Sequence, residues 1–470
     1  MAPQRERPAD HGDGHPDRAD RADRADRASI AAIATAAGAG GVGIVRVSGP
    51  AARPIGEAIC ARALTPRLAT HARFRDGDGE VIDDGIALYF AAPASYTGED
   101  VLELQAHGSP VLLAALLRRC IELGARQARP GEFTERAFLE GKLDLAQAEA
   151  VADLVAAGSQ AAARAARRSL DGEFSRRVDA VLAQLTELRV YVEAALDFPD
   201  EQIDFLAAPE LKRRLHDTRA ALEALLASAR QGLRLREGLH VLILGAPNVG
   251  KSSLLNALAA EDRAIVSDIA GTTRDLLRES LDLDGVALTL VDSAGLRESP
   301  DAIEAEGMRR ARAELQRADL VLAIGDAQSP PRLDEALRAQ LPEGARVLWI
   351  HNKIDQSGAA ATVETREDGE HLHLSARTGA GLDGLRSRLR TEAGGEALAE
   401  GGFSARARHV DALERTRVAL DTASAALVDG QAELAAEDLR QAQLALGEVT
   451  GVLDADMLLG RIFAGFCIGK

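Results

Sequence analysis

The chain has 470 residues, enough for about three domains, and its 46% apolar and 27% charged residues are typical of globular proteins. The formal net charge of −17 argues against a protein that binds nucleic acid by itself, so such a role needs a local basic patch or a second protein. No apolar run could span a bilayer, no secretory signal is recognisable and the three distant cysteines suit a reducing compartment. We therefore expect a cytoplasmic protein with no membrane partner.

Residues 1–28 are predicted to form a disordered charged tail. Residues 17–28 repeat the unit Asp-Arg-Ala, whose period of three matches neither a buried helix face nor a buried strand face. Because nothing apolar here could be buried, the segment should remain a solvated extension.

Residues 29–140 mix short strands with a helix, which predicts an α+β domain. The runs VGIVRVSG, GIALYF and VLELQ are bounded by Gly, Pro and Asp, as strands usually are. A helix is predicted to begin after Ser109 as its N-cap and to end before Gly124, with Pro110 in its first turn.

Two segments with helical periodicity, residues 141–236 and 396–470, predict an all-α domain that is split in sequence. The first carries apolar residues three or four positions apart: Val178, Val181, Leu182, Leu185, Leu188 and Val192. The second is predicted to bury a looser face made of Leu434, Leu439, Leu446 and Val449.

Residues 237–395, between these segments, alternate strands with helices. The β-rich runs are LHVLILG, VALTLVD, DLVLAIGD, RVLWIHN and HLHLSA. This alternation predicts a doubly wound parallel sheet. The simplest organisation is an α/β domain inserted into the helical domain.

Residues 245–252, GAPNVGKS, fit the phosphate-loop pattern G-x-x-x-x-G-K-[ST] between a predicted strand and a predicted helix. In such a loop, backbone N–H groups and the helix N-terminus surround phosphate oxygens. Lys251 is predicted to neutralise the outer phosphates, and Ser252 to place its hydroxyl on Mg²⁺.

Four further segments follow in the order typical of a Ras-like GTPase. They are GTTRD at 271–275, DSAG at 292–295, NKID at 352–355 and SAR at 375–377. Asp355 can accept hydrogen bonds from N1–H and the exocyclic amine of guanine, a donor pair that adenine lacks. Residues 237–395 are therefore predicted to be a P-loop domain that binds and hydrolyses GTP.

One position departs from ordinary Ras-like hydrolysis. Leu296 follows DSAG, where a water-orienting Gln is expected, and a leucine cannot orient water. Another group must take that role, and the nearby candidates are Glu298, Asp301, Glu304, Glu306, Arg274 and Arg297.

Beyond the nucleotide motifs, the chain resembles the family of tRNA wobble-uridine modification GTPases called MnmE or TrmE, from about Ile30 to Lys470. The resemblance is carried by AAIATAAGAGGVGIVRVSG, SYTGEDVLELQAHGSPV, RPGEFTERAFLEGKLDLAQAEAVADL, RVYVEAALDFPDE and LLGRIFAGFCIGK. The chain departs from the family at ATAAGAGG, where two prolines and an arginine are usual.

The resemblance implies a homodimer that works with an FAD-dependent partner, called MnmG or GidA, in a heterotetramer. Together they would add an aminomethyl or carboxymethylaminomethyl group to C5 of the wobble uridine of tRNA. The carbon would come from a 5-formyl- or methylene-tetrahydrofolate bound to the N-terminal domain, which also dimerises. The implied folate-binding residues are Arg46, Glu103, Lys142 and Lys470.

The strand pattern agrees with a folate-binding role for Glu103. Leu102 and Leu104 should face one side of the strand VLELQ, and Glu103 the other. An acid on the polar face of a strand can pair with the hydrogen-bond donors of a pterin ring.

The resemblance further implies that K⁺ stimulates hydrolysis when the GTPase domains of the dimer meet. Asn248 matches the K⁺-binding side chain of the family. The other implied K⁺ ligands are Ser267, Ile269 and Thr272.

For Mg²⁺ and the attacking water, the resemblance implies two more residues. Thr273 would join Ser252 on Mg²⁺, and Glu304 matches the water-orienting acid of the family, with Lys251 as the second catalytic residue. The residues predicted to contact the nucleotide are Asn248, Val249, Gly250, Lys251, Ser252, Ser253, Ser267, Asp268, Ile269, Ala270, Gly271, Thr272, Thr273, Asp292, Ser293, Ala294, Gly295, Asn352, Lys353, Ile354, Asp355, Ser375, Ala376 and Arg377.

Cys467 has three possible roles. CIGK is a poor lipidation box, because Gly469 and Lys470 occupy its last two positions. A nucleophilic thiolate would need a lowered pKa, with which Lys470 could help, and a base and a positioned substrate. We therefore favour a tail that docks toward the folate, with chemistry at Cys467 as the alternative.

Two other functions are consistent with the GTPase motifs. One is a regulatory switch in ribosome or RNA assembly without folate chemistry; it predicts a basic appendage, which the acidic-to-neutral flanks disfavour. The other is a scaffold in which GTP only sets the shape of the dimer. Folate binding distinguishes the one-carbon function from both.

Overall fold

The structure is a computed structural model. It describes residues 28–197, 209–259, 278–283, 286–292, 318–333, 338–339, 341, 345–392, 402–451, 462, 466–467 and 469. These residues fall into two compact units. The first contains the described residues up to Asp144 together with those after Asp456, and the second runs from Leu145 to Ala455. The predicted charged tail lies outside the described residues except for Ala28.

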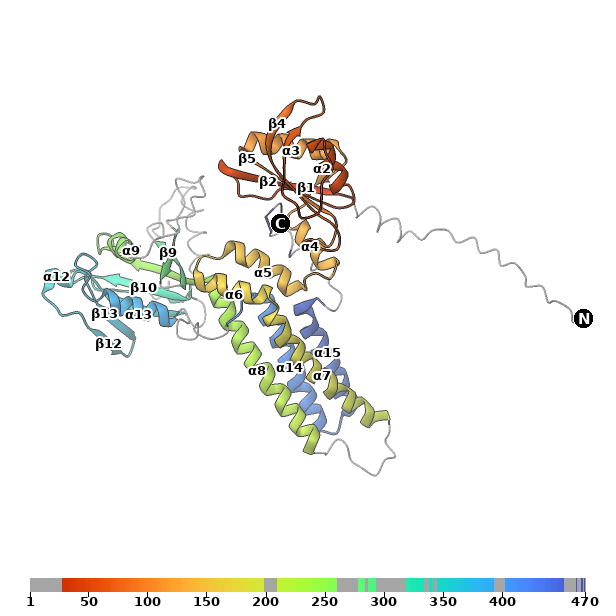
Figure 1. Cartoon of the computed structure of the whole chain (residues 1–470). Coiled ribbons are helices and arrows are strands. Elements are labelled where there is room, and N and C mark those ends of the chain that lie inside the picture. The colour runs from red at the N-terminus through yellow and green to blue at the C-terminus, as the bar shows by residue number, and fades with distance from the viewer. Residues whose placement is uncertain are drawn as a thin grey trace, which may run out of the picture. The chain divides into compact units, whose positions relative to one another are not determined.

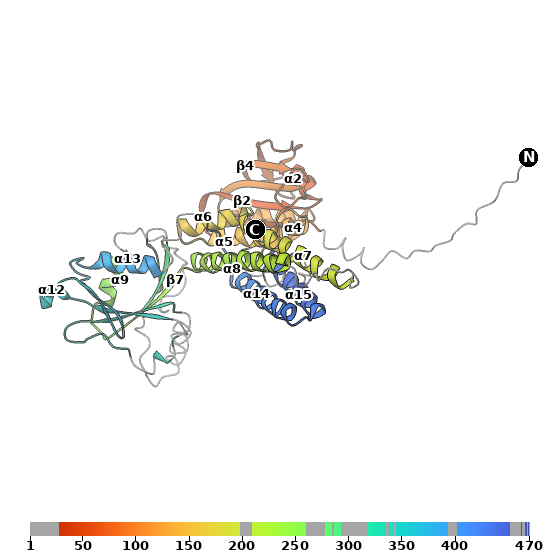
Figure 2. The ribbon, with the colours of Figure 1, turned by 90° about the horizontal axis from the view of Figure 1, so that it is seen from below.

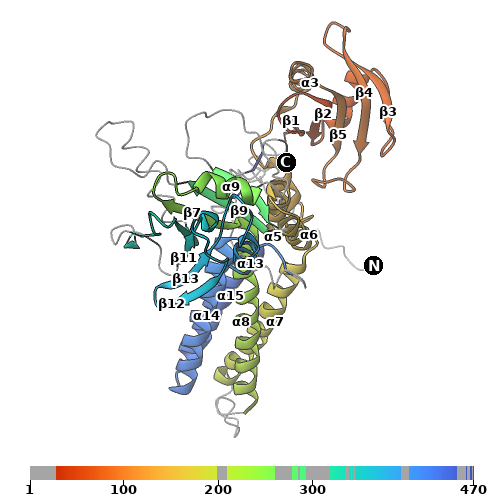
Figure 3. The ribbon, with the colours of Figure 1, turned by 90° about the vertical axis from the view of Figure 1, so that its left-hand side faces the viewer.

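The first unit is built on a six-stranded sheet in the order β3-β4-β5-β2-β1-β6. Neighbouring strands are antiparallel except β1 and β6, which are parallel. Figure 3 shows β1, β2, β5 and β4 side by side. The strands are β1 Ile30–Ile33, β2 Gly40–Ser48, β3 Thr70–Arg75, β4 Val81–Phe90, β5 Val101–Gly108 and β6 Arg126–Gln127.

Alternation along β5 separates a core face from a polar face, as predicted. Leu102 and Leu104 are buried in the core, whereas Glu103 points to the other side of the sheet and is half-buried. On β2, Arg46 stands directly opposite Glu103 in the antiparallel register. Two residues of opposite charge are therefore cross-strand neighbours on the polar face.

Within the described part of this unit there are three helices: α2 Ala52–Cys60, α3 Pro110–Glu122 and α4 Glu132–Leu139. Helix α3 has Ser109 as its N-cap residue and Pro110 in its first turn, so this predicted helix is confirmed. Its apolar face packs with α2 and the sheet in one core. Helix α4 follows Gly131, which has a positive φ of 69°, and the sequence periodicity did not predict it.

The second unit contains a helical bundle. Figure 1 shows α7, α8, α14 and α15 running side by side, and their buried residues form one apolar cluster. The helices of this part are α5 Leu145–Ala156, α6 Gln160–Leu170, α7 Glu173–Asp197, α8 Pro209–Glu237, α14 Ala407–Val428 and α15 Ala432–Thr450. Helices from both sides of the predicted insertion thus share one core.

The predicted apolar stripe of α7 is confirmed, because its residues belong to or pack against this core. On α15, Leu439, Leu446 and Val449 are fully buried, but Leu434 is 58% exposed. Leu434 was wrongly predicted to be buried: it lies near the start of α15, five residues before Leu439, and so faces away from it.

Between the two halves of the bundle lies the α/β body, residues 239–392. Its seven-stranded sheet has the order β12-β13-β11-β10-β7-β9-β8. The strands are β7 Leu239–Gly245, β8 Arg278–Leu283, β9 Val286–Asp292, β10 Leu320–Gly325, β11 Arg346–His351, β12 Val363–Arg366 and β13 Gly369–His373. The five predicted strands are all present and mutually parallel; β8 and β12, both antiparallel edges, were not predicted.

Helices α9 Lys251–Ala259 and α13 Leu382–Glu392 pack on the same face of this sheet (Figure 2). On β7, Val241 and Ile243 face these helices, while Leu242 and Leu244 face a second apolar cluster on the opposite side. Both faces are therefore covered, as in doubly wound folds. Among the described residues, no helix has the length and apolar content that crossing a membrane requires.

The contrast between Leu439 and Leu434 on α15 gives a first prediction. Leu439→Ala should destabilise the bundle by about 2–5 kcal/mol, because a fully buried leucine leaves a cavity behind. Leu434→Ala should change stability by no more than about 0.5 kcal/mol. Urea denaturation followed by helical circular dichroism measures both, and an equal loss in the two variants would contradict the assigned face of α15.

Candidate functional site

The phosphate loop joins β7 to α9, in the strand–loop–helix context that its motif requires. Asn248 and Gly250 both have positive φ, of 65° and 96°. A side chain at Gly250 would overlap the amide of Asn352, so only glycine fits there. The loop therefore brings backbone N–H groups to the start of α9, where the helix dipole favours an anion.

Lys251, the first residue of α9, reaches back over the loop. Its Nζ donates to the carbonyl oxygens of Gly245 at 3.0 Å and Ala246 at 3.1 Å. Ser252 and Ser253 follow on the exposed side of the helix start. A cation and a hydroxyl thus lie together at the helix N-terminus, an arrangement suited to phosphate and a phosphate-bound Mg²⁺.

Asn352 ties three loops together. Its Nδ2 donates to the carbonyl of Val249 in the phosphate loop at 2.9 Å, and its Oδ1 accepts from Ala376 N–H at 3.0 Å. Asn352 is buried and directly follows β11. The next residue, Lys353, donates to the Asn248 carbonyl at 2.6 Å. The NKID and SAR segments are thus fixed against the phosphate loop.

Asp355 presents a carboxylate beside these loops. Its Oδ1 accepts from Ser375 Oγ at 2.6 Å, and its Oδ2 lies 2.6 Å from Arg377 Nη2. The Ser375 hydrogen bond and the Arg377 charge hold the pKa of Asp355 below its ordinary value. The carboxylate is therefore ionised at neutral pH and can accept hydrogen bonds from a base.

The other predicted residues of this site are only partly described. Asp292 ends β9 beside β7, but nothing further is described of it. The remaining ones lie outside the described residues: Ser267, Asp268, Ile269, Ala270, Gly271, Thr272, Thr273, Ser293, Ala294, Gly295 and Glu304.

A second cluster of functional candidates lies in the first unit, around Arg46. Nε and Nη2 of Arg46 donate to Oε1 of Glu103 at 3.0 and 2.9 Å. The guanidinium also lies 5.8 Å from the ring centres of Tyr96 and Phe133. These rings were not predicted from periodicity, although both lie in segments, SYTGED and RPGEFTER, that carry the family resemblance.

The C-terminal segment docks onto this cluster. Arg46 Nη1 donates to the carbonyl of Gly469 at 3.4 Å, and Gly131 N–H donates to the carbonyl of Cys467 at 3.4 Å. Gly469 has a φ of 99°, and a Cβ there would overlap the carbonyl of Ile33. Tail docking was the favoured prediction for this segment, and these contacts are of the kind that it requires.

The structure brings Arg46, Glu103 and the tail together, but it does not show Lys142 among them. Lys142 is exposed after α4, where its backbone N–H donates to Ala137. Lys470 lies outside the described residues. Cys467 is exposed.

A buried ion-pair network lies beside the docked tail. Glu132, at the start of α4, pairs with Arg126 and Arg136 and accepts from Arg129 N–H at 2.8 Å. Burial by itself raises the pKa of Glu132, but the bonds from Arg126 and Arg129 outweigh it and lower the pKa to about 2. Arg136 continues the network to Glu99 at 2.8 Å.

Two family models match the chain. The model described as GTP-binding protein TrmE N-terminus matches residues 29–142. The model described as MnmE helical domain matches residues 145–467. The matched segments together span the two units.

Curated relatives are similar over nearly the whole chain. The tRNA modification GTPase MnmE of Xanthomonas campestris pv. campestris is 60% identical over 429 residues, which cover 91% of this chain and 95% of the relative. The protein of the same name from Xylella fastidiosa is 55% identical and covers 91% and 94%. Among solved structures, the G domain of the T. maritima FeoB iron transporter is 22% identical, covers 33% of this chain and 98% of that one, and has a TM-score of 0.23.

The lowered pKa of Glu132 predicts an acid-sensitive first unit. A carboxyl whose pKa falls on folding, here from 4.5 to about 2, stabilises the fold above the unfolded pKa and loses that effect as the pH falls toward the folded one. Protection of residues 126–139 from hydrogen exchange should therefore fall progressively between about pH 5 and about pH 2. In a Glu132→Gln variant protection should be lower at pH 5 but should fall less on acidification; a parallel fall in both proteins would contradict the assignment.

Proposed function

This chain belongs to the MnmE family of tRNA modification GTPases, and we propose that it hydrolyses GTP as one component of a tRNA-modifying complex. The observation that carries the proposal is the position of Asn352, which bonds the phosphate loop and the SAR loop together beside Asp355. One buried amide thus sets the distance between the phosphate end and the base end of a nucleotide site.

At the phosphate end, Lys251 would exchange its two carbonyl partners for the outer phosphates of GTP. That exchange suits a ligand, because a phosphate oxygen forms a stronger, charge-assisted bond with the ammonium group than a carbonyl does. Ser252, with its exposed hydroxyl on α9, and Thr273 would hold Mg²⁺, which neutralises developing charge on the phosphates.

Asn248 would bind K⁺ together with Ser267, Ile269 and Thr272. The exposed Asn248 lies in the phosphate loop, and its backbone carbonyl is already held by Lys353. A monovalent cation there would supply positive charge of the kind that an arginine finger supplies elsewhere. Glu304 would orient the attacking water, since Leu296 cannot do so.

The folate part of the proposal rests on the Arg46–Glu103 pair. Both arginine bonds end on Oε1 of Glu103, so its Oε2 can accept from the donors of a pterin ring. Tyr96 is exposed and adds a flat apolar surface nearby, whereas Phe133 is fully buried and supports the arginine from within the fold. The carbonyl of Gly469 in the docked tail accepts from the same arginine. Lys142 and Lys470 would contribute charge toward the acidic part of a folate.

The remaining parts of the proposal concern partners. The protein would act as a homodimer with an FAD-dependent partner of the MnmG type, transferring a folate-bound one-carbon unit to C5 of the wobble uridine. Its three cysteines are free, as in proteins of a reducing compartment, which supports a cytoplasmic location. Burial raises the pKa of Cys60 to about 11 and that of Cys120 to about 12, so any thiol chemistry falls to Cys467.

Asp355→Asn tests the base end of the GTP site. Guanine would lose two charge-assisted hydrogen bonds worth about 3 kcal/mol or more together, so GTP affinity should fall at least about a hundredfold. Asp383→Asn is the matched control, because Asp383 is fully exposed on α13. Fluorescent-nucleotide titration measures both, and equal GTP affinity in Asp355→Asn and the unchanged chain would overturn the assignment of Asp355.

Calorimetric titration with 5-formyltetrahydrofolate tests the one-carbon function. We expect binding by the full chain, with a loss of at least about tenfold in Glu103→Ala and in a chain that lacks residues 467–470, since each removes a polar partner of the bound ligand. Glu57→Ala, which breaks an exposed ion pair with Arg53 on α2 of the same unit, should bind normally. If the unchanged chain does not bind, a scaffold or a regulatory GTPase switch becomes the better function.

A further inference from the structure

The chain enters the α/β body from the helical bundle and later returns to it, and the structure describes the entry and the last part of the return. The leading connection, residues 235–238, ends α8 and runs into β7. The returning connection, residues 402–406, runs into α14. The returning connection lies against the end of α8. Gly232, one turn before the leading connection, approaches the carbonyl of Phe403 so closely that a Cβ would overlap it.

One buried carboxylate on α5 holds both connections. Oδ1 of Asp153 accepts from Nε of Arg236, in the leading connection, at 2.8 Å and from Nη2 of Arg406, in the returning connection, at 2.7 Å. Its Oδ2 lies 3.4 Å from Oγ of Ser404. The Asp153 side chain is only 5% exposed. Its ion pairs with the two arginines offset the cost of burying a carboxylate.

The returning connection is also fixed by other bonds. Arg406 donates to the carbonyl of Glu149 at 3.0 Å, one turn before Asp153 on α5. Ser404 N–H donates to the carbonyl of Ala165 at 3.2 Å, and Arg168 donates to the carbonyl of Gly402 at 2.9 Å, both on α6. These bonds attach residues 402–406 to α5 and α6 of the bundle.

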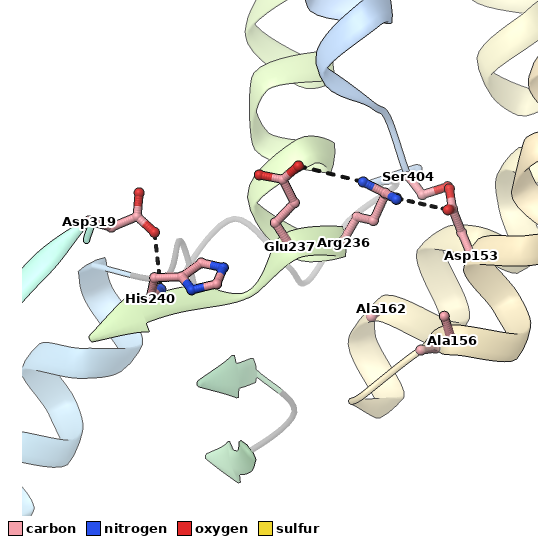
Figure 4. Close-up of a pocket in the computed structure, with 9 residues that line it drawn as sticks. Asp153, Ala156, Ala162, Arg236, Glu237, His240, Asp319 and Ser404 are labelled. Carbon is pink, nitrogen blue, oxygen red and sulfur yellow. Dashed lines mark hydrogen bonds and ion pairs between the residues drawn. The ribbon is translucent and has the colours of Figure 1, made fainter. Parts of the chain in front are cut away.

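The leading connection is held differently: Leu235 packs against α6, while the Arg236 side chain, in the last turn of α8, pairs with Asp153 and also lies 3.5 Å from Glu237. Arg236 lies at the edge of a cavity of about 550 Å³ that is also lined by Glu237, His240 and Asp319 (Figure 4). Its side chain is 32% exposed, and the cavity leaves space into which the guanidinium can move. The bond between Arg236 and Asp153 can therefore break while the carboxylate keeps Arg406 as a partner.

Strand β7 connects this bond to the nucleotide site. It begins directly after the leading connection and ends at Gly245, where the phosphate loop starts. A movement of the phosphate loop transmitted along β7 would reach the end of α8, which carries Arg236. The helix that carries Asp153, α5, begins at Leu145, directly after Asp144, the last residue of the N-terminal segment of the first unit.

We propose that Asp153 is a positioning residue that couples the nucleotide state of the α/β body to α5 through Arg236. The inference rests on the proposed function, because it requires that the phosphate loop binds GTP. Since α5 continues covalently into the first unit, a shift of α5 reaches the unit that carries the predicted folate site.

Arg236→Ala tests the proposal. It leaves Asp153 paired with Arg406, so the bundle should keep its fold. The measurement is hydrogen exchange of residues 145–156 in the full chain, with Mg²⁺ and K⁺, bound to GDP or to a non-hydrolysable GTP analogue. Exchange should differ about fivefold or more between the two nucleotides in the unchanged chain, as typical coupling requires, and less than about twofold in the variant.

Arg230→Ala is the matched control. Arg230 lies on the same helix and also pairs with a residue after the α/β body, Glu414, but it is exposed and does not touch Asp153. It should keep the full difference between nucleotides, and Arg236→Lys, which retains the charge, should restore part of it. All three variants should hydrolyse GTP within about twofold of the unchanged rate, as expected for positions outside the nucleotide site.

The possible results distinguish failure of this inference from failure of the proposed function. A full nucleotide response in Arg236→Ala, or an equal loss in Arg230→Ala, overturns the role of Asp153 while leaving the GTPase function in place. If the unchanged chain fails to bind or hydrolyse GTP, the proposed function fails and the inference fails with it.

Discussion

Paired buried charges hold together helices that lie far apart in the chain, and the rest of the second unit depends on them. Glu149 on α5 accepts from Arg408 at 2.7 and 2.8 Å and lies 2.8 Å from Nε2 of His409. Burial alone raises the pKa of Glu149, but His409 and Arg408 hold it below its ordinary value. A carboxylate this deeply buried costs much free energy unless it is paired, so the contact between α5 and α14 depends on Arg408 and His409.

How local the signal for each element is decides which parts of the fold the sequence could predict. The five parallel strands and the stripe on α7 follow from local periodicity and were predicted correctly. The edge strands β8 and β12 were missed because runs such as RESLDL and VETR carry few apolar residues. The pairing of Asp153 with Arg236 and Arg406 has no local signal, since the partners are 83 and 253 positions away.

The residues of the candidate sites likewise divide into those that short motifs predicted and those that depend on contacts between distant segments. Asn352 and Asp355 were predicted because they lie in short motifs of fixed spacing; the structure bonds Asn352 to the phosphate loop and Asp355 to Ser375 of the SAR segment. Tyr96 and Phe133 beside Arg46 depend on how a loop and a helix meet the sheet, which periodicity does not encode. The contact of Arg46 with Gly469 spans 423 positions, and the resemblance alone suggested it.

The arrangement of charge bears on how an acidic protein could serve tRNA. The arginines on the exposed faces of the bundle are largely paired with acids one turn away, as Arg213 is with Glu210 and Arg440 with Glu437. A phosphate would have to compete with those carboxylates, which also repel it. The tRNA-binding energy of such a complex must therefore come largely from a second protein or from arginines that rearrange. A movement of α5 that follows GTP binding would then change how this chain presents its first unit to a tRNA.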